Sequence, residues 1–173
     1  MVVRKRTVFA RCYNRIMRII GIDPGTGILG FGVVDFENQK TKVIDAGVVT
    51  TPPHTPTEDR LVEIFNSLQE IIDATKPDVM SVEKLFFARN ITTAISVAEA
   101  RGVAILAGKK AGLKIAEYTP LQIKQTLTGY GRATKQQIQE MVRIQLSLKN
   151  IPKPDDCADA LAVAITHHRM GIS

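Results

Sequence analysis

Residues 17–25 read MRIIGIDPG, and this stretch decides the fold class. Met17–Asp23 is a short apolar run closed by a Pro-Gly pair, which is typical of a buried strand that ends in a tight turn. Two further strands, Gly30–Phe36 and Lys42–Val49, follow after short connections. Three strands in quick succession predict an antiparallel meander at the start of a sheet.

The rest of the chain alternates between helical patterns and two more short strands. The expected strands are Asp78–Glu83 and Leu113–Tyr118. The expected helices cover Glu58–Ala74, Ile91–Ala111, a segment between Pro120 and Gly129, a segment from Thr134 to Leu146, and Asp155–His168. Thr57 is expected to cap the first of these helices and Thr134 the fourth. The order βββ-α-β-α-β-α-α-α predicts an α/β fold in which helices flank a mixed sheet of five strands.

At 173 residues the chain suits one folded domain with a substantial core. Residues 1–16 carry five basic and no acidic side chains and lack the features of a secretion signal. We therefore expect a basic N-terminal extension over residues 1–16, either poorly ordered or created by an upstream start codon, and a single domain over residues 17–173. Only two cysteines are present and no run approaches the ~18 apolar residues of a membrane span, so we expect a cytoplasmic protein without a membrane partner.

The net charge of +6 is unevenly distributed along the chain. Residues 17–100 carry 7 basic and 12 acidic side chains, whereas residues 101–149 carry 9 basic and only 2 acidic ones. An acidic half beside a basic half is the pattern expected of a metal site next to a phosphate-binding track. The simpler alternative is that the basic segment consists of solvated helix faces.

Two acidic residues stand at the exits of apolar strands. Asp23 ends the first strand and Glu83 ends the fourth. Strand ends open onto the crevices where α/β proteins bind ligands, so the two carboxylates share one crevice if their strands are neighbours. Close carboxylates repel each other unless a cation holds them together. For Asp23 alone, a turn-forming role before Pro24 is an equal alternative.

Two more acids lie at the start of the last helix. Asp156 and Asp159 are three residues apart, so both project from one helical face, and the small alanines around them let the helix approach the sheet closely. The helix dipole also favours acidic residues in a first turn, and this is the simpler explanation of the two acids. Asp155 falls off the shared face, and we interpret it as a cap or a solvated charge. Cys157 is expected to be a small buried residue.

The four carboxylates together are oxygen ligands that suit a hard cation such as Mg²⁺, with Mn²⁺ as a substitute. Two such ions ~4 Å apart activate a water molecule and steady the leaving oxygen in phosphodiester hydrolysis. The sequence has no Cys/His spacing for zinc, and His54, His167 and His168 are expected at the surface. The acids and the basic segment therefore point to a metal-dependent nuclease.

Five short motifs resemble those of RuvC, the family of bacterial Holliday junction resolvases. In chain order they are Gly21-Ile22-Asp23-Pro24-Gly25, Val82-Glu83-Lys84-Leu85-Phe86, Ala100-Arg101-Gly102-Val103-Ala104, Ile123-Lys124-Gln125-Thr126 and Asp156-Cys157-Ala158-Asp159-Ala160-Leu161-Ala162. The resemblance implies a ribonuclease H-like fold, a homodimer, paired symmetric nicks in a four-way DNA junction, and docking to the RuvA–RuvB branch-migration complex. The Gly/Ala-rich helix Ile91–Ala111 is a candidate for the dimer interface.

The same resemblance implies roles for individual residues. The acids Asp23, Glu83, Asp156 and Asp159 correspond to the family's catalytic, metal-binding carboxylates. Phe86 corresponds to a loop aromatic that stacks on a base near the crossover, and Phe87 beside it is a second candidate. Lys124, Lys135 and Arg89 correspond to basic residues that contact DNA, although either lysine taken singly could face solvent.

Three other functions fit parts of the pattern. Residues 23–27, DPGTG, also resemble the phosphate-binding turn of actin-like ATPases, but the sequence lacks a second phosphate motif and an adenosine site. A nuclease family that processes ribosomal RNA precursors shares the GIDPG opening, without predicting the Asp156 and Asp159 pair or Phe86. A junction-binding protein without catalysis is the third alternative, and four intact acids argue against it.

Overall fold

The computed structural model describes residues 16–37, 40–85 and 91–171. Its centre is one mixed sheet with the strand order β3-β2-β1-β4-β5. The strands are β1 (Met17–Asp23), β2 (Ile28–Glu37), β3 (Lys40–Thr50), β4 (Val79–Glu83) and β5 (Lys114–Tyr118). The first three form the predicted antiparallel meander, whereas β4 runs parallel to β1 and β5 parallel to β4. The predicted five-stranded mixed sheet is confirmed.

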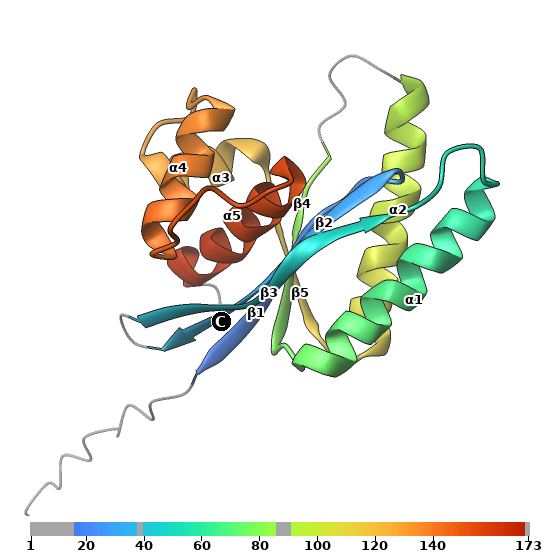
Figure 1. Ribbon diagram of the computed structural model, residues 1–173, viewed down its shortest axis with the longest axis horizontal. Helices are drawn as coiled ribbons and strands as arrows, with labels where there is room; N and C mark the ends of the chain where they lie inside the picture. Colours follow the sequence, from blue (N-terminus) through green and yellow to red (C-terminus); the bar gives the residue numbers. More distant parts are fainter. Residues whose placement is uncertain (1–15, 38–39, 86–90, 172–173) are drawn as a thin grey trace, which may run out of the picture.

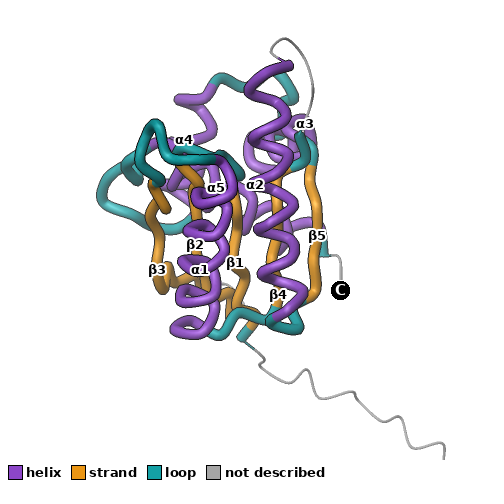
Figure 2. Tube along the Cα trace, turned by 90° about the vertical axis from the view of Figure 1, so that its right-hand side faces the viewer, coloured by secondary structure: helices purple, strands orange, loops and turns teal. Residues whose placement is uncertain are grey.

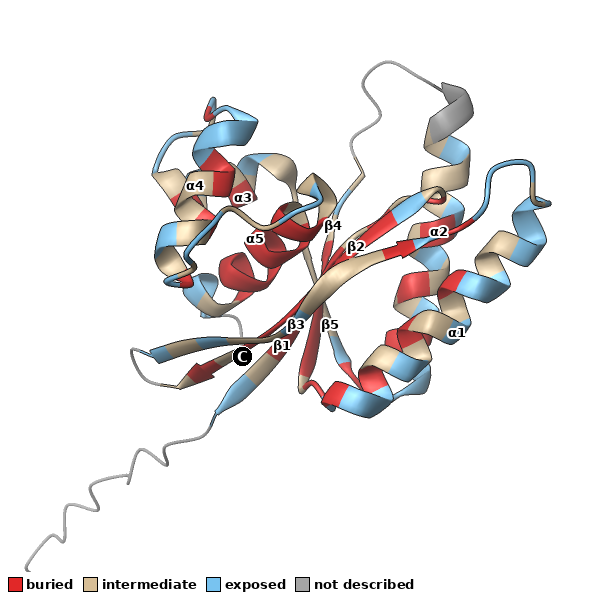
Figure 3. Cartoon of the chain, viewed as in Figure 1, coloured by how far each residue is buried: buried red, intermediate tan, exposed pale blue. Residues whose placement is uncertain are grey.

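Helices cover both faces of this sheet (Figure 1). They are α1 (Thr57–Thr75), α2 (Ile91–Lys110), α3 (Pro120–Thr128), α4 (Lys135–Gln145) and α5 (Asp155–Met170). α1 and α2 lie side by side on one face, and α3, α4 and α5 pack on the other (Figures 1 and 2). Each face has its own apolar core where the helices meet the strands (Figure 3). Within the described residues, no helix is long and apolar enough to cross a bilayer.

α5 lies close to the sheet because β1 and β2 present glycine where the helix crosses them. A Cβ atom at Gly21 would collide with the carbonyl oxygen of Ala160, and one at Gly30 with the carbonyl oxygen of Asp156. Gly30 is the partner of Asp23 in the β1–β2 ladder. The first turn of α5 is therefore held directly over the end of β1.

The ends of the helices follow from local sequence, with one exception. Thr134 caps α4 and Thr119 caps α3, each in a capping box with the glutamine three residues later. α3 ends at Gly129, which adopts a positive φ of 73°. The prediction that Thr57 caps α1 is wrong, because the helix begins at Thr57 and the preceding Pro56 takes the extended N-cap conformation without a side-chain hydrogen bond.

The expectation that the histidine pair near the C-terminus lies at the surface is wrong. His167 is only 4% exposed, and its Nδ1 lies 2.7 Å from the hydroxyl of Tyr118. The ring of His168 stacks on Phe36 with 4.1 Å between the ring centroids. Burial extends this far because α5 passes between the sheet and the α3–α4 pair along most of its length. His54 is exposed and Cys157 is buried, as expected.

Candidate active site

Asp23 and Glu83 stand at neighbouring strand ends. β1 and β4 pair in parallel with Ile22 opposite Val82, so the next residue of each strand is one of the two acids. Side chains alternate between the faces of a strand. Asp23 thus shares a face with Gly21, which meets α5, and both acids point towards the helical layer of α3, α4 and α5.

The start of α5 brings two further acids to the same place. Asp159 lines a cleft together with Glu83, and Asp156 is close enough to Asp23 for the two charges to repel. The four predicted acids therefore come from three elements, β1, β4 and α5, and lie within electrostatic reach of one another.

Burial and mutual repulsion disfavour the charged forms of three of the acids and raise their pKa values. Burial, reinforced by the charges of Glu83, Asp159 and Asp156, raises the pKa of Asp23 to about 8. Burial, reinforced by Asp159, raises the pKa of Glu83 to about 7. Burial also raises the pKa of Asp159, although Lys135 opposes the shift. A cation placed among these groups would favour their charged forms.

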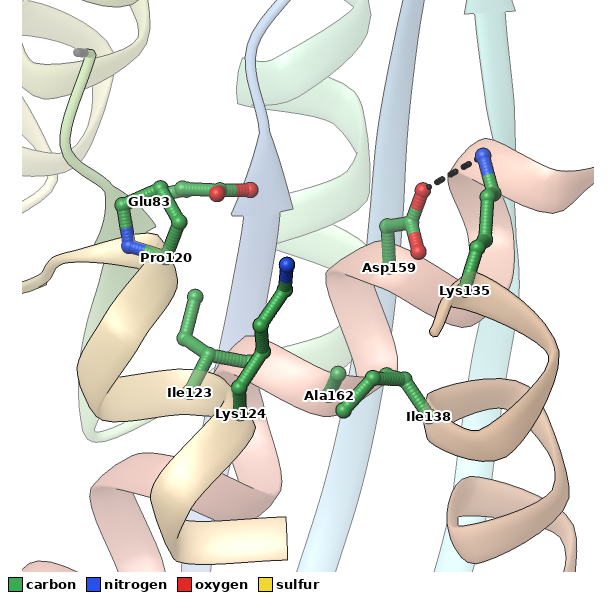
Figure 4. A pocket seen from close by; sticks show the side chains of 8 residues that line it. All are labelled: Glu83, Pro120, Ile123, Lys124, Lys135, Ile138, Asp159 and Ala162. Carbon is green, nitrogen blue, oxygen red and sulfur yellow. Dashed lines mark ion pairs between the residues drawn. The ribbon is translucent and has the colours of Figure 1, made fainter. Parts of the chain in front are cut away.

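Two lysines reach into the cleft from α3 and α4. The Nζ atom of Lys135 lies 3.0 Å from Oδ2 of Asp159. The side chain of Lys124 points into the space between Glu83 and Asp159, and its charge lowers the pKa of Glu83 against the larger effect of burial (Figure 4). The cleft thus has carboxylates on the strand and α5 side and ammonium groups on the α3 and α4 side.

The cleft is small, and both charged and apolar side chains line it. Its volume is about 210 Å³, which is room for several water molecules at roughly 30 Å³ each. Between the charged groups it is lined by Pro120, Ile123, Ile138 and Ala162. These apolar side chains come from α3, α4 and α5, and all of them except Pro120 are buried.

The donor set fits a hard divalent cation in its chemistry. It consists only of carboxylate oxygens, the ligands that Mg²⁺ and Mn²⁺ prefer. Among the described residues, however, no group of three or more His, Cys, Asp or Glu side chains is arranged so that it could hold a metal ion as it stands. The ammonium of Lys135 rests against Asp159 instead. A metal held by all four carboxylates would need them to turn towards one another, and Lys135 would have to share or release Asp159.

Asp155 does not cap α5, and its carboxylate is a largely solvated charge that pairs with two lysines. Pro154 is the N-cap of α5. Oδ1 of Asp155 lies 3.1 Å from Nζ of Lys153, and its Oδ2 lies 3.6 Å from Nζ of Lys135. The helical spacing of four residues between Asp155 and Asp159 would have indicated that both can contact one lysine.

Some predicted residues lie outside the part of the chain that is described. Phe86, Phe87 and Arg89 belong to the segment 86–90, which follows β4. The glycines of β1 and β2 are residues that the sequence analysis missed, and their signal was the spacing of Gly21, Gly30 and Gly32 within otherwise apolar strands.

Comparison with known proteins identifies the family of this chain. The family described as crossover junction endodeoxyribonuclease RuvC matches residues 19–167. The chain belongs to the RuvC family. Family members from Brevibacillus brevis and Chloroflexus aurantiacus, both named crossover junction endodeoxyribonuclease RuvC, are 54% and 52% identical to it over 151 residues. That is 87% of this chain, and 91% and 92% of the two relatives.

Solved structures of RuvC agree with this fold. RuvC of Thermus thermophilus in complex with a Holliday junction substrate superposes with a TM-score of 0.84 at 38% identity, over 89% of this chain and 94% of that one. The yeast mitochondrial Holliday junction resolvase Ydc2 superposes with a TM-score of 0.64 at 16% identity, over 88% of this chain and 78% of that one, and so shares the fold. The expected ribonuclease H-like resolvase architecture is confirmed.

Proposed function

We propose that this protein is an endonuclease that resolves four-way Holliday junctions in DNA recombination and repair, by paired symmetric nicks that depend on Mg²⁺ or Mn²⁺. The observation that carries the proposal is the meeting of four carboxylates at the ends of β1 and β4 and the start of α5, in a member of the RuvC family. The named activity of the 52–54% identical relatives supports the reaction class. The junction bound to the Thermus thermophilus protein supports the substrate.

The acids would hold the metal, and the lysines would meet the phosphate. Asp23, Glu83, Asp156 and Asp159 are the proposed ligands of two divalent ions per site. When bound, divalent ions supply an activated water molecule and positive charge for the leaving oxygen. Lys124 and Lys135 face the acids across the cleft, so they are placed to bind phosphate oxygens and to offset the negative charge that develops on them.

The segment directly after β4 is the proposed contact with the junction. This segment, residues 86–90, begins three positions after Glu83, so it lies close to that acid in the chain. Phe86 is proposed to stack on an unpaired base near the crossover, with Phe87 as the second candidate, and Arg89 to contact phosphate. A stacked base contributes ~1–3 kcal/mol, which favours an open crossover over intact duplex.

Symmetric cleavage calls for two copies of the chain. A junction with two-fold symmetry presents two opposed strands, and a two-fold dimer places one active site on each. α2 exposes Ile95 and Leu106, which are 59% and 53% accessible, on a helix rich in glycine and alanine. We propose α2 as the dimer interface, the RuvA–RuvB complex as a further partner, and the cytoplasm as the place of action.

The alternative functions account for less of the sequence. A nuclease for RNA precursors would share the GIDPG opening, and an actin-like ATPase fragment would share the DPGTG turn. The family match instead continues to residue 167, through the acids of α5. An ATP-turnover assay separates the ATPase alternative, because a junction nuclease shows no junction-independent ATP hydrolysis.

The proposed catalytic role of the acids is tested with Asp23→Asn. We expect this variant to bind a synthetic four-way junction as the unmodified protein does and to cleave it at least about 100-fold more slowly, because one carboxylate ligand is lost while the lysines remain. The matched control is Asp73→Asn, which removes an exposed carboxylate of α1 on the other face of the sheet. Gel-shift binding and single-turnover cleavage are the two measurements. Undiminished cleavage by Asp23→Asn would contradict the proposal.

A further inference from the structure

Asp155 and Asp159 share one lysine. They are four residues apart on α5, so their side chains stand one turn from each other on the helix surface. Nζ of Lys135 lies 3.0 Å from Asp159 and 3.6 Å from Asp155. The ammonium therefore lies between a carboxylate of the proposed metal site and one outside it.

A divalent cation and this ammonium compete for Asp159. Two positive charges this close repel each other, and the repulsion is stronger near a protein surface than in bulk water. A cation bound at Asp159 would therefore displace the ammonium. Asp155 already lies within 3.6 Å of it, so a small turn of the lysine side chain suffices to change partners.

The two oxygens of Asp155 have different neighbours. Lys153 Nζ contacts Oδ1 at 3.1 Å, whereas Lys135 faces Oδ2. Lys153 thus holds the carboxylate in place without covering the oxygen that Lys135 needs. Asp155 is 43% exposed and Lys135 53%, so both side chains have room to move.

We propose that Asp155 is a positioning residue that receives the ammonium of Lys135 when a divalent cation binds at Asp159. The exchange reduces the competition between lysine and metal, and it keeps the ammonium at the edge of the cleft, where a phosphate oxygen would lie. This inference rests on the proposed function, because it presumes that the acids bind a cation.

A double-mutant cycle with Mn²⁺ affinity as the readout tests the inference without any activity measurement. The four proteins are the unmodified chain, Asp155→Asn, Lys135→Gln and the double variant, each titrated with Mn²⁺ in a calorimeter in the absence of DNA. We expect Asp155→Asn to weaken Mn²⁺ binding on the order of five-fold in the unmodified background, as for the loss of one surface ion pair. In the Lys135→Gln background we expect less than about a two-fold effect, because no ammonium needs a second partner.

Two further variants distinguish a positioning role of Asp155 from a general effect of negative charge on Mn²⁺ affinity. Asp155→Glu keeps a carboxylate within reach of Lys135 and is expected to restore most of the affinity. Glu140→Gln removes one negative charge from α4, where it pairs with Arg143, and is expected to leave Mn²⁺ affinity unchanged.

The outcomes distinguish this inference from the function on which it rests. An equal loss of affinity from Asp155→Asn in both backgrounds would overturn the positioning role and leave the proposed function standing, because it would reflect only the lost charge. Absence of Mn²⁺ binding by the unmodified protein would overturn both.

Discussion

At the scale of single residues, the same physical effect has opposite consequences at the two ends of α5. At its start, burial raises the pKa of Asp159, one of the acids proposed to gain a cation. Near its end, burial lowers the pKa of His167, reinforced by the charges of His168 and Lys114. A bound cation would relieve the repulsion among the acids. His167, by contrast, is a neutral, hydrogen-bonded part of the core.

The depressed pKa of His167 predicts a loss of stability in acid. The unfolded chain takes up the proton near the ordinary pKa of 6.5, whereas the folded chain takes it up only at lower pH. The stabilisation is therefore fully present above about pH 6.5 and declines as the pH falls below it. His167→Asn, which cannot take up this proton, should show a smaller decline between pH 7.5 and pH 5 in urea unfolding, with His168 retaining part of it. An unchanged decline would show that His167 is not responsible.

At the scale of elements, the site depends on how closely α5 approaches the sheet. The N-cap of α4 and the order of the elements could be predicted, because each depends on a short stretch of neighbouring residues. The contact between Gly30 and the backbone of Asp156 could not, because it joins residues 126 positions apart. The burial of His167 escaped prediction for the same reason, because its partner Tyr118 lies 49 positions away in the sequence.

Gly30→Ala tests this close approach. The added Cβ would collide with the carbonyl oxygen of Asp156, which cannot move without shifting the first turn of α5. We expect a loss of about 1–3 kcal/mol in the free energy of unfolding, as for other overpacked sites, together with slower junction cleavage at temperatures where the variant is fully folded. Gly47→Ala in β3 is the matched control, since its Cβ would meet only the ring of Phe31 at 3.3 Å. Equal stability of the two variants would contradict the account.

At the scale of the whole molecule, acidic and basic segments that are separate in the sequence form the two sides of one cleft. β4 supplies Glu83 from the acidic half, with Asp23 beside it at the end of β1, and α3 and α4 supply lysines from the segment with 9 basic and 2 acidic residues. A metal site beside a phosphate-binding surface is the arrangement that phosphodiester hydrolysis needs. Family membership then narrows this chemistry to the four-way junction.

Cleavage mapping on a synthetic four-way junction tests the central claim most directly. Each of the four strands is labelled in turn, and the purified protein is added with Mg²⁺, with Mn²⁺ or with a chelator, beside a linear duplex of the same sequence. The account predicts one nick in each of two opposed strands at symmetric positions, dependent on the divalent ion, and no comparable cleavage of the duplex. Equal cleavage of junction and duplex, or symmetric nicks that persist in the chelator, would contradict it.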